Sequence, residues 1–165
     1  MSDAILYTTL EQEGEAEFVE KKSVFIGHAA PVKSEEEAQA FVKRYKNTYM
    51  DARHNVWAYL MKGEIVARYS DDGEPQGTAG VPVLDTIRKS GVTDAVVVVT
   101  RYFGGILLGA GGLVRAYSHK NFCENLHKTL RRCSSAIVLG ILIPPRVEIR
   151  FTILYSYLLN LRFLK

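Results

Sequence analysis

The feature that most constrains the fold is an unbroken run of β-branched residues within the sequence AVVVVT, residues 95–100. A continuous apolar run is typical of a strand that is buried on both faces, whereas a half-exposed strand alternates apolar and polar residues. The run leads into a glycine-rich segment, residues 102–112, and residues 113–132 then carry apolar side chains at helical spacing. The sequence therefore predicts a buried strand, a glycine-rich loop and a long helix in succession.

Strand and helix signals also occur in the rest of the chain. Two strands are expected between residues 15 and 31, with a turn at Lys21, Lys22 and Ser23. A helix is expected from Ser34 to near residues 47–51, because Ser34 can cap it and Glu37 occupies the capping-box position. Further strands are expected at 54–60 and 64–69, a loop at 70–82 and a helix at 84–89. These elements predict an α+β fold.

Charge and composition limit the class of protein. The net charge is +3, but residues 1–50 carry −3 and residues 51–165 carry +6, which indicates either an anionic partner for the later part or an ordinary mixed surface. The acidic N-terminus does not resemble a signal peptide, and the most apolar run, residues 136–145, is too short to span a bilayer. Cys123 and Cys133 are interpreted as reduced thiols. A cytoplasmic protein without a membrane partner is expected.

The glycine-rich segment is the first candidate site. Glycines let backbone N–H groups approach a ligand, and a helix N-terminus attracts anions. Arg101 and Arg115 flank the segment. Aromatic side chains beside an arginine can stack on unpaired bases, or they can face the core and line the loop; the structural role is favoured for Phe103, and both roles stay open for Tyr102. The alternative is that the glycines allow a tight turn and close packing of the helix on the sheet. Neither the dinucleotide-binding pattern GxGxxG nor the Walker pattern occurs.

The second candidate is the acidic loop around Asp71, Asp72 and Glu74. Three carboxylates within four positions can hold a hard cation or supply an acid–base pair, although the spacing is not that of an EF-hand. The favoured alternative is a rigid turn in which aspartate side chains accept hydrogen bonds from nearby backbone N–H groups. His54 is a candidate acid or base, with a structural hydrogen bond at a strand edge as the favoured alternative. The spacing of potential ligands does not predict a metal site.

Three separated motifs together resemble one protein family. They are His54-Asn55 with Trp57-Ala-Tyr59, then Ser70-Asp-Asp-Gly-Glu-Pro75 with Gly77-Thr-Ala-Gly80, and finally residues 96–105 with residues 109–118. Their order and sequence are similar to those of the Impact/YigZ family over about residues 15–132. The resemblance implies a fold like domain 2 of ribosomal protein S5, an α+β sandwich with a mainly antiparallel sheet and helices on one face. It also implies a connection with translation, because eukaryotic relatives regulate the kinase that senses amino-acid starvation by competing for its activating partner.

The resemblance also implies two domains. Residues 1–133 are expected to form the Impact-type domain, and residues 134–165 a linker and the start of a ferredoxin-like domain, as in bacterial members of the family. Residues 147–153 alternate like its first strand and residues 156–164 suit the start of a helix, after which most of that domain is missing. A lone strand and helix cannot bury their apolar faces. This segment is therefore expected to pack on the first domain, to pair with another chain or to be poorly ordered, and a truncated or frame-shifted gene is a hypothesis for it.

Three functions remain open on these observations. The leading interpretation is a non-catalytic, cofactor-free binding protein for RNA or the ribosome, acting in translation. Its anion-binding surface would comprise Arg101, Tyr102, Gly104, Gly105, Gly109, Gly111, Gly112 and Arg115, in a cleft shaped by Asp71, Asp72, Glu74 and Thr78. The alternatives are an enzyme acting on a nucleotide or phosphorylated metabolite, with Mg²⁺ on the acidic loop and His54 as acid or base, and a module that binds a regulatory protein partner.

Overall fold

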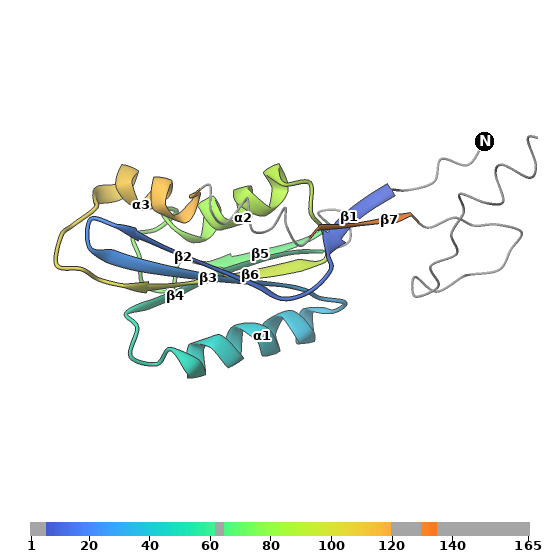
Figure 1. The fold of residues 1–165 in the computed structure, drawn as a ribbon, viewed down its shortest axis with the longest axis horizontal. Helices are drawn as coiled ribbons and strands as arrows, with labels where there is room; N and C mark the ends of the chain where they lie inside the picture. The colour runs from blue at the N-terminus through green and yellow to red at the C-terminus, as the bar shows by residue number, and fades with distance from the viewer. Residues whose placement is uncertain (1–5, 62–64, 120–129, 135–165) are drawn as a thin grey trace, which may run out of the picture. The chain divides into compact units, whose positions relative to one another are not determined.

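The computed structural model, which describes residues 6–61, 65–119 and 130–134, contains a five-stranded antiparallel sheet. Residues 7–132 group into one compact unit, which contains this sheet. The strand order is β2 (Gly14–Glu20), β3 (Ser23–Pro31), β6 (Ala95–Tyr102), β4 (His54–Met61) and β5 (Val66–Ser70) (Figure 1). The helices are α1 (Glu35–Thr48), α2 (Gly80–Lys89) and α3 (Gly109–Tyr117). The short strands β1 (Leu6–Leu10) and β7 (Leu130–Ser134) pair with each other.

The β-branched run forms a strand that is buried on both faces, as its composition predicted, and this strand is the central one of the sheet. Residues 95–100 of β6 are all buried, with β3 on one side and β4 on the other. Alternate valines of this strand face opposite layers: Val97 and Val99 belong to the apolar cluster that includes α2 and α3, and Val96 and Val98 belong to the cluster that includes α1. The α+β class and the antiparallel sheet are thereby confirmed.

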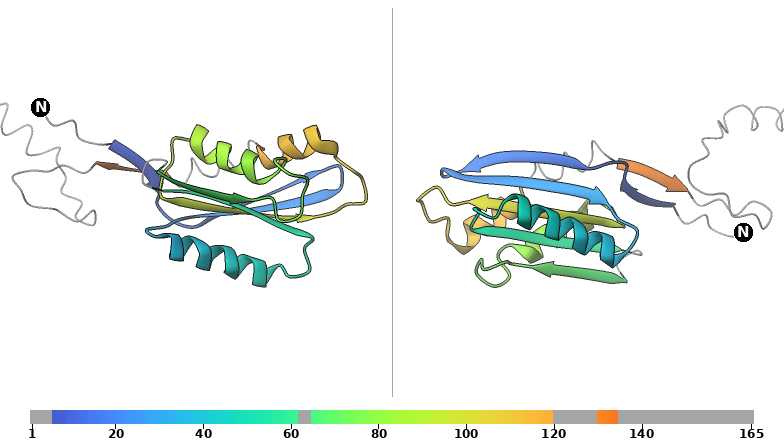
Figure 2. Two further views of the ribbon diagram at one scale, coloured as in Figure 1. Left: turned by 180° about the vertical axis from the view of Figure 1, so that it is seen from behind. Right: turned by 90° about the horizontal axis from the view of Figure 1, so that it is seen from below.

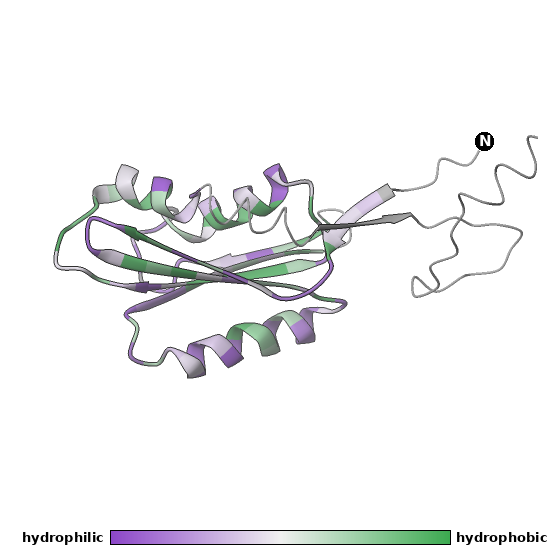
Figure 3. Cartoon of the chain, in the orientation of Figure 1, coloured by the Kyte–Doolittle hydropathy of each residue, from purple (hydrophilic) through white to green (hydrophobic). Residues whose placement is uncertain are grey.

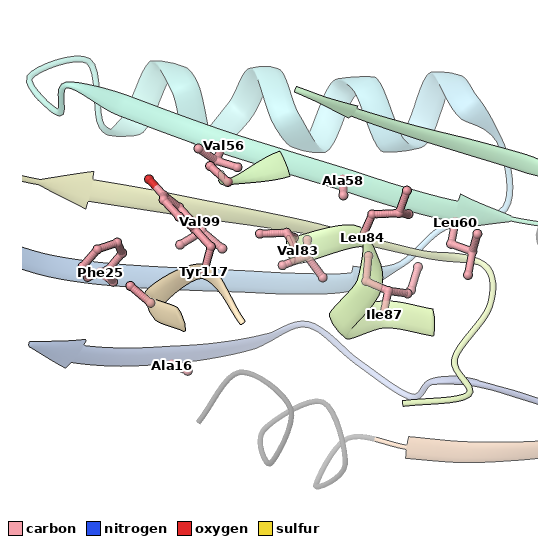
Figure 4. Packing of buried hydrophobic residues seen from close by; sticks show 14 of the residues in the cluster. Ala16, Phe25, Val56, Ala58, Leu60, Val83, Leu84, Ile87, Val99 and Tyr117 are labelled. Carbon is pink, nitrogen blue, oxygen red and sulfur yellow. The ribbon is translucent and has the colours of Figure 1, made fainter. Parts of the chain in front are cut away.

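Helices cover both faces of the sheet, so the expectation that they lie on one face is wrong. Figures 1 and 2 show α1 on one face and α2 with α3 on the other, and apolar residues lie along the strands between them (Figure 3). On the α2 and α3 side, side chains such as Phe25, Val56, Val83 and Tyr117 pack together (Figure 4). The composition of β6 explains this arrangement, because a strand that is apolar on both sides requires a cover on each face.

Two helix boundaries differ from the sequence-based expectation. Helix α2 begins at Gly80 and not at Leu84, because the carboxylate of Asp71 accepts hydrogen bonds from the N–H groups of Ala79 and Gly80 at its start. The expected helix at residues 113–132 is α3, which runs only from Gly109 to Tyr117. Residues 130–134 form β7, whose pairing with β1 prevails over the helical spacing of the apolar residues. The expected extension to Arg132 is therefore wrong.

A buried histidine couples the stability of this fold to pH. His28 of β3 is 2% exposed and stacks on Tyr45 of α1, with ring centroids 3.8 Å apart. Burial lowers the pKa of His28, whereas the carboxylates of Glu15 and Glu13 raise it and Arg44 lowers it further. His28 therefore binds a proton at a higher pH in the unfolded chain than in the folded chain. The free energy of unfolding falls as the pH drops below the pKa that His28 has in the unfolded chain.

We expect a His28→Gln variant to lose part of this pH dependence. Between about pH 7.5 and about pH 5.5, the His28 contribution to the slope of unfolding free energy is at most about 1.4 kcal/mol per pH unit. Urea unfolding of the variant and the parent protein at both pH values measures the difference. Equal slopes would show that His28 takes up its proton as readily in the folded protein as in the unfolded chain.

Candidate functional site: a pocket at the start of α3

A pocket of about 360 Å³ opens where the end of β6, the start of β4, the loop after β5 and the first turn of α3 meet. Its polar and charged lining comes from Arg53, His54, Glu74 and Arg101, and Gly109 and Ala110 contribute the first turn of α3. The remaining lining is mostly apolar and consists of Gly73, Pro75, Phe103, Leu107, Leu108 and Leu113. The pocket thus combines positively charged groups with an apolar wall.

A buried ion pair forms part of the lining of this pocket. Arg101 is 5% exposed and Glu74 is 8% exposed. The Nη1 of Arg101 donates to Glu74 Oε1 over 2.6 Å, and the Tyr117 hydroxyl donates to the same oxygen over 2.8 Å. Burial, reinforced by the Glu74 carboxylate, raises the pKa of Tyr117 far above its usual value, so this hydroxyl stays protonated. Because Glu74 is held by two donors, the pair is a fixed part of the fold.

The Arg101 guanidinium is not fully satisfied by these contacts. Its Nη2 donates to Ser23 Oγ over a long 3.4 Å, and the guanidinium carbon lies 5.5 Å from the centre of the Phe25 ring and 5.7 Å from that of Phe103. The Nε of Arg101 is buried and has no hydrogen-bond partner among the described residues. A buried donor without an acceptor is costly, so this N–H group would be stabilised by an acceptor that a ligand brought to it.

His54 is held in a defined orientation beside the ion pair. Its Nδ1 lies 2.8 Å from the backbone carbonyl oxygen of Asp72. Because a carbonyl only accepts, Nδ1 carries the proton and donates. The Nε2 lies 4.0 Å from Glu74 Oε2. A neutral His54 therefore presents an acceptor nitrogen, and a protonated one presents a second N–H and a positive charge.

The acidic loop holds the backbone in place, as the turn interpretation proposed. Asp71 accepts hydrogen bonds from the N–H groups of Gly77, Ala79 and Gly80 at distances of 2.8–3.1 Å. Asp72 accepts one from the Asn55 N–H over 2.6 Å and pairs with Lys46. The Thr78 hydroxyl donates to the Pro75 carbonyl over 2.6 Å. Of the four residues predicted to shape the cleft, the structure brings Glu74 into the pocket lining, whereas Asp71, Asp72 and Thr78 contact other parts of the loop and sheet.

The hydrogen bonds and ion pairs of these carboxylates also bear on the Mg²⁺ site that the enzyme alternative requires. The carboxylates of Asp71, Asp72 and Glu74 are directed to three different sets of protein donors. Within the described part of the chain, no group of His, Cys, Asp and Glu side chains has the arrangement of a metal site. The three carboxylates therefore do not converge on one position where a cation would sit.

The glycines of the loop have separate structural reasons. A Cβ on Gly104 would lie 2.0 Å from the backbone of Lys22, and Gly104 donates its N–H to Ser23 Oγ over 3.2 Å. Gly105 and Gly109 have positive φ values of 84° and 71°. Gly112 packs on Leu108, whereas a Cβ on Gly111 would meet nothing within 4 Å. Close packing thus explains Gly104, and backbone conformation explains Gly105 and Gly109.

The predicted anion-binding residues divide into two groups. Arg101 and Gly109 line the pocket, together with the candidate acid–base residue His54. Arg115 is exposed on the last turn of α3, and the Tyr102 hydroxyl donates to Asp51 over 2.9 Å on the far side of β6 from Arg101. The sequence reasoning missed Arg53, Leu107 and Tyr117 as parts of the site, and it favoured a structural role for Phe103, which lines the pocket. Arg53 could have been included because it directly precedes the candidate residue His54 in the sequence. No local signal points to Tyr117, because its contact with Glu74 depends on tertiary packing.

No helix of the described residues is long and apolar enough to cross a bilayer.

The Impact N-terminal domain matches residues 21–122. The chain is 48% identical to the IMPACT family member YvyE of Bacillus subtilis over 122 residues, covering 73% of this chain and 56% of YvyE. It is 47% identical to YigZ of Escherichia coli over 100 residues, covering 59% of this chain and 49% of YigZ.

A solved structure supports the same relationship. The crystal structure of a hypothetical protein aligns with a TM-score of 0.71 at 36% identity, covering 78% of this chain and 63% of that protein. The chain spans about half the length of the curated relatives named above. All residues that line the pocket lie within the matched residues 21–122. The chain therefore belongs to the IMPACT family, and its pocket is built entirely from the Impact N-terminal domain.

Proposed function

We propose that this chain is a non-catalytic binding protein of translation or its regulation, which binds RNA or ribosomal phosphates through the pocket at the start of α3. The observation that carries the proposal is the buried Arg101, which has an unsatisfied Nε–H and lines the same pocket as the first turn of α3. Leu108 supplies no side-chain cap to this helix. An anion in the pocket would accept hydrogen bonds from the Arg101 Nε–H and from the unpaired backbone N–H groups in the first turn of α3. It would also lie at the positive end of the helix dipole.

The charge around the pocket supports an anionic ligand. Glu74 offsets the charge of Arg101, and the exposed Arg53 leaves the lining with a net positive charge even when His54 is neutral. Arg115 adds a further positive charge on the exposed surface of α3. Positive groups at an open surface steer phosphates to a site and make the affinity sensitive to salt. The link to translation follows from the family resemblance and remains part of the proposal.

The protein-interaction alternative has one observation in its favour. Phe103, Ile106, Leu107 and Val114 are 40–83% exposed, and they all belong to the loop before α3 or to α3 itself. Exposed apolar side chains in one segment are typical of an interaction surface. The enzyme alternative with Mg²⁺ receives less support, because the carboxylates that would hold the ion are directed to other groups.

We expect the variants Arg53→Ala and Arg115→Ala to bind short single-stranded RNA about threefold to tenfold more weakly than the parent protein, because each removes one positive group that would bind a phosphate. The slope of log K against log salt should fall in magnitude by about 0.7 for each such group removed. Fluorescence anisotropy across a salt series measures both quantities. Arg101→Ala is less informative, because it would leave Glu74 buried without its partner.

The matched control is Arg88→Ala, which removes the same charge from the last turn of α2, outside the pocket lining. It should retain the parent affinity and slope. Equal weakening by all three variants would show that only overall charge matters. Absence of RNA and ribosome binding at low salt by folded protein would contradict the proposed function and leave the interaction alternative.

A further inference from the structure

The depth of Arg101 places a limit on which phosphate can reach it. Arg101 lies in β6, the central strand of the sheet, and its side chain is 6% exposed. Arg101 is therefore largely covered by the sheet, and a ligand would reach it from the part of the pocket that Phe103, Leu107 and the start of α3 line. A phosphodiester within an RNA chain carries a nucleoside on each of two ester oxygens. A phosphate that approaches a side chain buried to this extent is less hindered when it carries one such substituent instead of two.

The size and lining of the pocket fit one such substituent. A volume of about 360 Å³ is near the lower end of the range for small-molecule sites. Phe103 and Leu107 also line the pocket, and they are 42% and 83% exposed. An aromatic ring at the wall of a phosphate site offers a stacking surface for a base. Arg53 lines the same pocket and directly precedes His54, the first residue of β4.

We propose that the pocket selects a terminal phosphomonoester, in the form of a phosphorylated RNA end or a free nucleoside monophosphate, over an internal phosphodiester. This inference rests on the proposed function and names the ligand class for the same site. The terminal phosphate would accept from the Arg101 Nε–H and from the N–H groups at the start of α3, and its base would stack on Phe103. A monoester dianion also benefits more than a diester from the positive charge of Arg53.

The test compares three RNA oligonucleotides of identical sequence and about ten nucleotides, which differ in carrying a 5′-phosphate, a 3′-phosphate or hydroxyls at both ends. We expect at least one phosphorylated oligonucleotide to bind the full chain about tenfold more tightly than the dihydroxyl form, a difference that one charge-assisted contact supplies. Equal affinity of all three would overturn this inference but would leave the proposed function standing. Failure of all three to bind at low salt would overturn both.

Competition with 5′-AMP, adenosine and inorganic phosphate distinguishes the sources of the phosphomonoester. Displacement by 5′-AMP as effective as that by the phosphorylated oligonucleotide would identify a free nucleotide as the ligand, and weaker displacement would identify an RNA end. Adenosine should not compete, because it lacks the phosphate. Competition by adenosine equal to that of 5′-AMP would contradict the inference, since the base alone would then account for binding.

Two variants test the geometry without removing either member of the buried ion pair. Phe103→Ala and Arg53→Ala should reduce the preference for the phosphorylated end to less than about threefold, because they remove the stacking surface and the rim charge. The matched aromatic control is Tyr69→Ala. Tyr69 of β5 is 49% exposed, and it is not one of the described residues that line the pocket. It should keep the full preference. An unchanged preference in Phe103→Ala and Arg53→Ala would place end recognition elsewhere and overturn the inference for this pocket.

Discussion

Replacing Glu74 by glutamine is expected to lower the free energy of unfolding by about 3–5 kcal/mol, the usual cost of removing one member of a buried ion pair. Both partners are almost fully buried, and Glu74 Oε1 accepts from Arg101 and from Tyr117. The variant leaves the Arg101 guanidinium inside the sheet without a countercharge. Urea denaturation followed by circular dichroism measures the decrease in stability.

The matched control is Asp85→Asn, which makes the same acid-to-amide change in an exposed ion pair. Asp85 lies 3.5 Å from Arg88, and both side chains are well exposed. Exposed pairs contribute about 0–1 kcal/mol, so this variant should be nearly as stable as the parent. An Arg101→Met change added to Glu74→Gln should restore part of the stability, because no buried charge then remains. A decrease below about 1 kcal/mol for Glu74→Gln would contradict the prediction and would show that water reaches Arg101.

Gly104→Ala is expected to destabilise the protein by at least about 3 kcal/mol, the upper end of the cost of overpacking. An added Cβ would lie 2.0 Å from the carbonyl group of Lys22 and 2.5 Å from the Ser23 nitrogen. These are backbone atoms of the tight turn between β2 and β3, so they cannot move away as the end of a flexible side chain would. Thermal unfolding measures the destabilisation.

Gly111→Ala, in the same glycine-rich segment, is expected to increase the stability of the protein. Gly111 lies within α3, a Cβ there meets nothing within 4 Å, and its φ is not positive. Alanine is favoured over glycine inside a helix by about 0.5–1 kcal/mol, so this variant should be more stable than the parent. Equal effects of the two substitutions would contradict the packing explanation for Gly104.

Local sequence patterns predicted most of the elements, and one of them also indicated how the layers are arranged. The Ser34 cap and the acidic first turn specify the start of α1, and Ser34 Oγ accepts from the Glu37 N–H as the capping-box pattern requires. Covering the sheet on both faces was implicit in the valine run of β6, yet the family resemblance led to an expectation of helices on one face. The period of side chains along that strand was therefore the more reliable guide to the layers.

The chemistry of the acidic loop shows why residue type alone does not define a site. Asp71, Asp72 and Glu74 are close in sequence, and each is suited to bind a cation. The loop backbone directs Asp71 to the start of α2, Asp72 to β4 and Lys46, and Glu74 to Arg101. Positive φ at Asp72 and Gly73 produces the turn that separates them. Their directions depend on this backbone path, which spacing does not reveal.

The family, the central strand, the glycine-rich junction with α3 and the three motifs could all be predicted from the amino-acid sequence, because they depend on local periodicity and on residues adjacent in the chain. The burial of Arg101 against Glu74 and Tyr117 could not, since residues 27 and 43 positions apart in the chain meet there. The same holds for the pocket, which Arg53, Arg101 and Gly109 line while Arg115 remains outside it. Burial and long-range contact arise from packing of the whole sheet against its helices, and packing is not encoded in any single segment.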